Sequence, residues 1–461
     1  MGFAAKILKW MIILVAAAVV AVAGWMLIAP PALILVGTGY ASKIVCSNVF
    51  VAGRDADDVL VNDVQAPGHP VLRLIDIDVD REAETVSAAL FGIFGSSTSV
   101  YRAGLGCAVA PDGDIATAKA ASLDVDRPAP LGALWPLGNR VEPSQNPEID
   151  AILDDPQLTG PGMRAVVVVH DGRIVGERYG EGFSAETPLV GWSMTKTVNA
   201  AIAGTIIKVG NLDVAERSLL EIWSSDNRDE IALADLMSMS SGLEFNEDYG
   251  DVTDVTRMLY LEPDMAAFAS DKPLVAAIGE HFNYSSGTAV VLSRIWQNMF
   301  DDPQEALRWP HEALFGPLGM TSAVLETDAR GTYVGSSYLY ANAHDWARFG
   351  QFLLQNGVWN GQLVLPSGFL EWMREDAPAS DGDYGRGQLW LHGPRGTTPQ
   401  DQHPDTGFTL PNDAYWLLGH DGQTTTVIPS EGLVVVRLGL TPSKLGYKPQ
   451  ALVQALAAAL K

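Results

Sequence analysis

Hydrophobic positions follow a different pattern in the first part of the chain than in the rest. Residues 10–42 carry no charge, and residues 10–29 are about as long as a helix that crosses a bilayer. Lys6 and Lys9 precede this run, which predicts a cytoplasmic N-terminus, and the prolines at 30–31 should end the helix. A cleaved signal peptide is the alternative, because residues 21–23 are small. The apolar run continues past that site, which favours a membrane anchor.

Two apolar, β-branched runs at 163–170 and 173–179 flank Asp171-Gly172, which predicts a β-hairpin with a type I′ turn. Helical patterns follow from 195 to about 354, and they include 273–279. Strand patterns return at 414–419, 424–429 and 433–438, before a final helix at 449–461. Strands at both ends with helices between them predict an α+β domain. Its antiparallel sheet should be flanked by helices and accompanied by a mostly helical subdomain.

Proline-rich segments at 127–130 and 143–147 mark a domain boundary. We therefore expect an anchor or signal segment at 1–30, an irregular N-terminal extension at 31–146 and the main domain at 147–461. Cys46 and Cys107 are the chain's two cysteines, and an exported chain could pair them. No Cys-x-x-Cys or His-Glu-x-x-His pattern supports a metal site, so we predict a structural disulfide.

The chain of 461 residues has a formal charge of −25, with 55 acidic against 30 basic residues. This length allows one large core or two smaller ones. The acidity argues against a nucleic-acid partner and is typical of a soluble surface in an exposed compartment.

Ser193 and Lys196 lie three residues apart at the start of an apolar helical segment that ends near Gly210. Residues at this spacing share a helix face, so the lysine amine should lie beside the serine hydroxyl. A lysine desolvated in a closed pocket can lose its proton near neutral pH and act as a base. The structural alternative is a serine near a helix start with a surface lysine one turn later and no catalytic role.

Two further segments carry candidate chemistry. Tyr284 and Ser286 lie in a turn before a predicted helix, where a neighbouring cation would lower the pKa of the tyrosine and let it move protons. His420 and Gly422 follow a predicted strand, and the N–H of Gln423 could join that of Ser193 in an oxyanion hole. A packed tyrosine and a histidine in a turn are the corresponding structural interpretations.

Taken in order, these segments resemble the serine β-lactamase and penicillin-binding-protein superfamily, and within it the class C β-lactamase-like hydrolases. The sequence Ser-Met-Thr-Lys at 193–196 resembles the nucleophile motif, and Tyr-Ser-Ser at 284–286 stands where the superfamily has Tyr-x-Asn or Tyr-x-Ser. His-Asp-Gly at 420–422 stands where it has Lys-Thr-Gly or His-x-Gly. The segments at 236–243 and 337–349 are also similar. The resemblance covers roughly residues 149–461.

Departures from the β-lactamase pattern bear on the substrate. Ser286 replaces an asparagine and His420 replaces a lysine that help true β-lactamases bind the β-lactam. The pattern is closer to the esterases and 6-aminohexanoate-dimer hydrolases, whose second tyrosine near the scissile bond resembles Tyr249. A solvated surface tyrosine is the alternative at that position.

The resemblance implies a serine hydrolase that cleaves a small ester or amide through an acyl-enzyme on Ser193, without a metal or organic cofactor. Lys196 and Tyr284 would transfer protons. A peptidase for D-amino-acid peptides of the cell wall and a catalytically silent sensor are the alternatives. The predicted location is the periplasmic or extracytoplasmic side of a membrane, or outside the cell if the N-terminal segment is cleaved.

Overall fold

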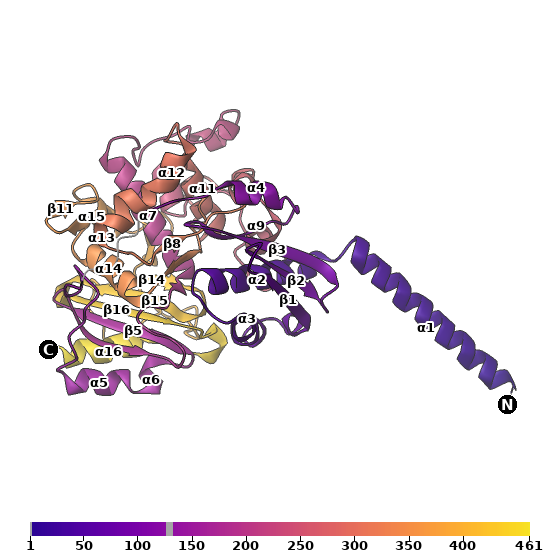
Figure 1. The fold of residues 1–461 in the computed structure, drawn as a ribbon. Coiled ribbons are helices and arrows are strands. Elements are labelled where there is room, and N and C mark those ends of the chain that lie inside the picture. Colours follow the sequence, from indigo (N-terminus) through magenta and orange to yellow (C-terminus); the bar gives the residue numbers. More distant parts are fainter. Residues whose placement is uncertain (1, 126–131) are drawn as a thin grey trace.

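The computed structural model describes residues 2–125 and 132–461, so the predicted boundary segment at 127–130 lies outside the described residues. Two described helices, α1 (Gly2–Ile28) and α2 (Ala32–Phe50), are long and apolar enough to cross a membrane. The apolar window of α1 is 0% buried, and the helix projects away from the rest of the chain (Figure 1). The window of α2 is 72% buried, so α2 is a helix of the protein interior.

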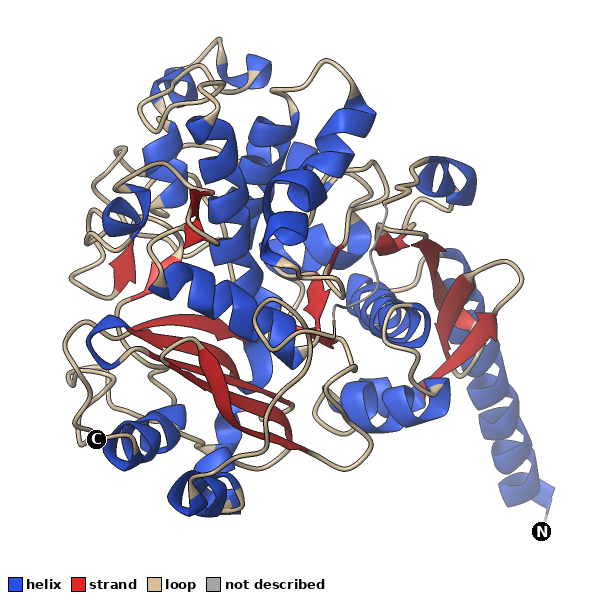
Figure 2. Ribbon diagram, turned by 60° about the vertical axis from the view of Figure 1, so that its left-hand side comes forward, coloured by secondary structure: helices blue, strands red, loops and turns tan. Residues whose placement is uncertain are grey.

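The mixed composition of the 31–146 segment led us to expect irregular structure, and this expectation is wrong. The segment contains a four-stranded antiparallel sheet in the order β1-β2-β3-β4, against which α2 packs (Figures 1 and 2). Besides α2, its described α-helices and strands are α3 (Ala56–Val59), β1 (Ile75–Asp80), β2 (Thr85–Leu90), β3 (Phe94–Arg102), β4 (Gly106–Val109) and α4 (Ile115–Ala120), and helical turns lie at Leu60–Gln65 and Pro70–Leu74. Gly92, Gly104 and Gly113 lie in turns with positive φ, whereas Asp76, Asp78 and Asp80 belong to β1.

The predicted disulfide is present and joins Cys46 of α2 to Cys107 of β4. A buried ion pair between Lys43 of α2 and Glu326 then ties the extension to the main domain. Glu326 also accepts hydrogen bonds from Ser47 Oγ at 2.8 Å and from Cys107 N at 2.7 Å. The extension is therefore attached through buried polar contacts as well as through apolar packing.

The main sheet has seven antiparallel strands in the order β12-β13-β14-β15-β16-β5-β6. The strands are β12 (Tyr384–Gly385), β13 (Leu389–Trp390), β14 (Tyr415–Gly419), β15 (Gln423–Ile428), β16 (Leu433–Gly439), β5 (Met163–His170) and β6 (Arg173–Tyr179). Pairing of β16 with β5 closes the sheet from both ends of the domain, as the sequence predicted. Positive φ angles of 49° at Asp171 and 75° at Gly172 agree with the predicted type I′ turn between β5 and β6.

Helices cover both faces of this sheet, as Figure 2 shows. Because side chains alternate along a strand, Val166 and Val168 of β5 face the cluster formed with α5 (Pro147–Leu153) and α16 (Pro449–Ala459). Val167 and Val169 face the larger cluster, which includes α14 (Ala343–Leu354). The continuous valine run thus reflects burial on both faces and confirms the α+β fold.

A mostly helical subdomain lies beyond α14. Its helices are α7 (Thr195–Lys208), α8 (Leu233–Met237), α9 (Asp254–Leu261), α10 (Met265–Ser270), α11 (Ser286–Gln297), α12 (Pro303–Pro310), α13 (Gly316–Leu318) and α15 (Phe369–Met373). Short strands β7 (Leu189–Val190), β9 (Leu339–Ala341) and β8 (Val324–Leu325) form a small sheet, and β10 (Val358–Trp359) pairs with β11 (Gln362–Leu363). The remaining short helix, α6 (Pro156–Thr159), follows α5.

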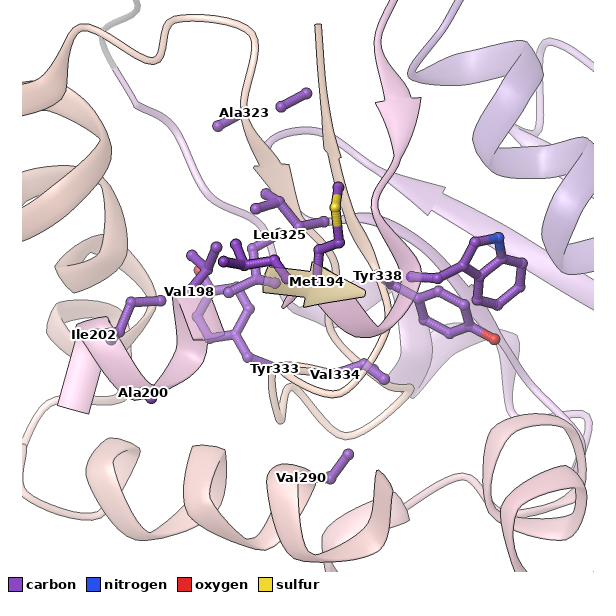
Figure 3. Packing of buried hydrophobic residues seen from close by; sticks show 14 of the residues in the cluster. Met194, Val198, Ala200, Ile202, Val290, Ala323, Leu325, Tyr333, Val334 and Tyr338 are labelled. Atoms are coloured by element: carbon purple, nitrogen blue, oxygen red, sulfur yellow. The ribbon is translucent and has the colours of Figure 1, made fainter. Parts of the chain in front are cut away.

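The buried side of α7 packs in the centre of the molecule. Figure 3 shows Met194 and Val198 in the same cluster as Leu325 and Val290, which come from β8 and α11. All four side chains are at most 3% exposed. This packing fixes the start of α7, where the candidate nucleophile lies.

Candidate active site

Ser193 lies in a 3₁₀ turn at Trp192–Met194 that leads directly into α7. The preceding Trp192 has φ +48°, a strained value for a bulky residue. Its ring is held near Tyr338 and His420, with centroid distances of 5.8 and 5.7 Å. Ser193 is partly exposed whereas Met194 is completely buried. The strained turn therefore presents the serine hydroxyl to solvent at the start of a rigid helix.

Lys196 is completely buried one helical turn after the serine. Its Nζ lies 3.2 Å from Ser193 Oγ, 3.0 Å from Ser286 Oγ and 3.1 Å from the carbonyl oxygen of Ser336. Burial lowers the pKa of Lys196 to about 8, although the charge of Glu247 opposes this shift. The lysine is thus placed to exchange a proton with Ser193 near neutral pH.

Helices α7 and α11 are joined by a buried polar side chain. Asn199 donates to the carbonyl of Ala289 at 2.8 Å and accepts from the Trp296 indole at 2.9 Å. Ser285 caps α11 by accepting from Thr288 N at 2.9 Å, as expected for a serine before a helix. These contacts hold the Tyr-Ser-Ser segment in a fixed position relative to α7.

Tyr284 lies beside Ser193, and Lys196 Nζ lies 4.7 Å from the centroid of the Tyr284 ring. The prediction that a nearby cation lowers the pKa of Tyr284 is wrong. Burial raises that pKa well above its ordinary value, and the negative charge of Glu247 raises it further. Tyr284 is therefore a neutral phenol at physiological pH and can donate a proton.

Glu247 is a site residue whose role the sequence analysis did not anticipate. Its carboxylate accepts from the main-chain N of Ser286 at 2.7 Å and from the Ser286 hydroxyl. Burial raises the pKa of Glu247, although Lys196 and the hydrogen bonds from Ser286 and Tyr249 oppose this. Ser286 thus links Lys196 to a carboxylate. One acidic residue in a loop gives no sequence signal for such a link.

Tyr249 is brought to the site, where its ring stacks on that of His420 with centroids 5.2 Å apart. His420 is exposed and its Nε2 lies 3.5 Å from Asp421 Oδ1. Together with Trp192, the two rings form an aromatic wall beside the nucleophile turn. We call these three residues, Trp192, Tyr249 and His420, the aromatic wall.

Gly422 and Gln423 lie on the hairpin that joins β14 to β15. The Gln423 side chain accepts from Gly439 N at 2.8 Å and donates to the Gly439 carbonyl, so any substrate contact by Gln423 falls to its main chain. A Cβ on Gly422 would meet Arg437 Nη1 at 3.0 Å, so this glycine faces β16. Gly419 makes the close approach instead, because a Cβ there would lie 2.2 Å from the carbonyl of Gly191.

Within residues 2–125 and 132–461, no group of three His, Cys, Asp or Glu side chains is placed to hold a metal ion. The chemistry available at the site comes from a hydroxyl, an amine, a phenol and a carboxylate.

The family model described as beta-lactamase matches residues 154–458. The chain belongs to the beta-lactamase family. At the level of that family the match supports a serine hydrolase. No curated protein matches the chain.

Solved structures of beta-lactamase-like proteins share its fold. A Bacillus anthracis protein assigned as a 6-aminohexanoate-dimer hydrolase matches with a TM-score of 0.54 and 24% identity, over 65% of this chain and 79% of its own. A Bacteroides dorei protein assigned as a beta-lactamase gives a TM-score of 0.52 and 20% identity, over 68% and 98%. EstCE1, a hydrolase with promiscuous acyltransferase activity, gives 0.51 and 15%, over 68% and 97%.

Proposed function

We propose that this beta-lactamase family protein hydrolyses an ester or amide bond through an acyl-enzyme on Ser193. The observation that carries the proposal is the 3.2 Å separation between Ser193 Oγ and the buried Lys196 Nζ. A hydroxyl becomes an effective nucleophile only when a base takes its proton, and a lysine with a pKa of about 8 has a substantial neutral fraction near neutral pH.

In the acylation step, neutral Lys196 accepts the Ser193 proton while Oγ attacks the substrate carbonyl carbon. The main-chain N–H groups of Ser193 and Gln423 stabilise the oxyanion in this proposal. Tyr284 donates its phenolic proton to the leaving alcohol or amine, and the Lys196 ammonium returns a proton to Tyr284. The step ends with an acylated serine, a neutral lysine and a neutral phenol.

Deacylation repeats the sequence with water. Lys196 takes a proton from the attacking water, and the second tetrahedral intermediate collapses when Ser193 Oγ leaves and recovers that proton. The high pKa of Tyr284 suits the acylation step. The phenolate that remains after Tyr284 has donated its proton is strongly basic, so the Lys196 ammonium quickly reprotonates it.

Ser286 and His420 stand where β-lactamases have an asparagine and a lysine, so the proposal covers other esters and amides rather than β-lactams. A peptidase for D-amino-acid peptides uses the same machinery and is distinguished by its substrate. We further propose that α1 anchors the protein and that residues from α2 onward lie on the extracytoplasmic side. Lys6 and Lys9, near the start of α1, and the Cys46–Cys107 disulfide support this topology.

Turnover of 4-nitrophenyl acetate by the full chain tests the proposed activity. Ser193→Ala should abolish the turnover, whereas Ser224→Ala, at an exposed serine, should leave it unchanged. A linear amide dimer, a D-amino-acid peptide and a β-lactam should then be compared under the same conditions. Absence of Ser193-dependent turnover of every substrate would favour a silent sensor and contradict the proposal.

A further inference from the structure

A cavity of about 190 Å³ lies between the aromatic wall, the N-terminal extension and α9. All three residues of the wall line it, and the N-terminal extension supplies much of the remaining surface. Its apolar lining comes from α2, from the turn at 70–74 and from α9, and includes Leu33, Val36, Tyr40, Val71, Leu72 and Tyr260.

The extension reaches the site because α2 crosses α9 closely. A Cβ on Gly39 would lie 2.9 Å from Tyr260 Cβ, so only glycine allows this approach without a shift. Tyr40 and Tyr260 then meet edge to face, with ring centroids 5.7 Å apart. The extension is therefore packed against α9 and lines the cavity next to the aromatic wall.

Charged lining residues are few. His69 and Asp251 are exposed, and Asp421 is paired with His420 at 3.5 Å. By contrast, Val36, Leu72 and Tyr260 are at most 8% exposed. A polar ligand would gain little binding free energy in a cavity with this lining, whereas methylene groups gain free energy when they leave water for it.

The cavity lies near the end of α1, where other apolar side chains are exposed, and this agrees with a preference for methylene groups. Leu33, which lines it, is 38% exposed and lies five residues after the last residue of α1, Ile28. Phe91 and Ile93, at the tip between β2 and β3, are 54% and 62% exposed. A Cβ on the neighbouring Gly95 would contact Pro30 and Ile34, so this tip lies beside the start of α2. The apolar surface at the end of α1 thus adjoins the cavity.

We propose that this cavity binds an aliphatic chain of the substrate while the scissile carbonyl lies at Ser193. This inference rests on the proposed function and names its substrate class: esters or amides with a chain of several methylenes. The chain would cross the aromatic wall and end between α2 and the turn at 70–74. The extension is then a specificity element of the enzyme as well as a connection to α1.

The test uses the full chain in lipid nanodiscs and two ester series. One series lengthens the acyl group from 4-nitrophenyl acetate through butyrate to hexanoate, and the other lengthens the alcohol from ethyl to hexyl acetate. We expect kcat/KM to rise roughly two- to fourfold per added methylene in one series until the cavity is full.

Val36→Trp narrows the cavity without changing a proposed catalytic group. It should lower kcat/KM for the longest favoured ester at least tenfold and leave 4-nitrophenyl acetate within about twofold, which also shows that the variant is folded. Val71→Trp, at a second lining residue in the turn at 70–74, should give the same pattern. Val61→Trp is the control, because Val61 is 52% exposed on the same extension and does not line the cavity.

A flat chain-length dependence in both series would overturn the inference while leaving the proposed hydrolase intact. The same conclusion follows if a rising dependence is unaffected by both tryptophan variants. Absence of turnover of all esters, including the acetate, would instead contradict the proposed function itself.

Discussion

Lys196 Nζ lies 3.2 Å from Ser193 Oγ, on a side chain that solvent does not reach. The serine itself is partly exposed, so the base is shielded while the nucleophile is accessible. Ser193 lies in the 3₁₀ turn before α7, where it stays partly exposed, whereas Lys196 lies in the buried first turn of α7. This arrangement lowers the pKa of the lysine and leaves the hydroxyl open to a substrate.

The first prediction concerns pH. Because burial lowers the pKa of Lys196 to about 8, and the neutral amine is the active form, kcat/KM for 4-nitrophenyl acetate should rise as pH increases through about 8. The pH profile of the full chain between 6 and 10, corrected for spontaneous hydrolysis, measures this. A rate that is independent of pH across that range would exclude Lys196 as the base.

Glu247→Gln should move this rise to lower pH. The negative charge of Glu247 raises the pKa of Lys196, so its removal lets the lysine lose its proton more easily. The amide oxygen still offers Ser286 an acceptor, which preserves most of the geometry. Glu244→Gln, at an exposed carboxylate three residues earlier, is the matched control and should leave the profile in place. A shift to higher pH in Glu247→Gln would show that this electrostatic account has the wrong sign.

Tyr284→Phe should reduce the rate most for substrates with a poor leaving group. An alkoxide needs a proton to depart, whereas nitrophenolate does not, so the loss should be about 10²- to 10⁴-fold for an alkyl ester and much smaller for 4-nitrophenyl acetate. Paired measurements on ethyl acetate and 4-nitrophenyl acetate separate the two cases. Equal losses for both esters would mean that Tyr284 does not protonate the leaving group.

The disulfide should contribute substantially to stability. It closes a loop with a sequence separation of 61 residues, and the chain-entropy estimate for a loop of this length is about 4 kcal/mol. Denaturant unfolding of the full chain with and without the double change Cys46→Ser and Cys107→Ser measures the difference. Both cysteines are fully buried. An unchanged unfolding midpoint in the double variant would show that the other contacts of the extension hold it without the disulfide.

Membrane fractionation and the N-terminal peptide test whether α1 is an anchor. If α1 is an anchor, the full chain should remain in the membrane fraction after alkaline carbonate washing, and its N-terminal peptide should include residues before 20. Deletion of residues 2–28 should release the protein. A mature chain that begins near residue 24 would instead establish a cleaved signal peptide.

Sequence alone predicted the parts of the fold whose patterns are local. The β5–β6 hairpin, the strands β14, β15 and β16 and the start of α7 all have strong periodicity and clear turn residues. The segment 273–279 is a failure of the same reasoning, because it is not helical. Leu274 pairs with Leu243 instead, and Val275 N donates to the carbonyl of Gly242. A tertiary contact thus outweighed a short helical pattern.

Other features depend on contacts between distant segments, which one sequence does not display. Glu247 becomes important only because the loop that carries it meets the N-terminus of α11. The pKa of Tyr284 depends on burial and on that same carboxylate, so its sign could not be deduced from a neighbouring lysine. The extension looked irregular because Gly, Pro and Asp are mixed with its short apolar runs, and its packing on α9 is visible only in the structure.

The central claim is that Ser193 forms a covalent acyl intermediate. Acid quenching during turnover of a 4-nitrophenyl ester, followed by intact-mass and peptide analysis, tests it most directly. The account predicts a mass increase equal to one acyl group, located on the peptide that contains Ser193 and absent in Ser193→Ala. An acyl group on another residue, or turnover that persists in Ser193→Ala, would contradict it.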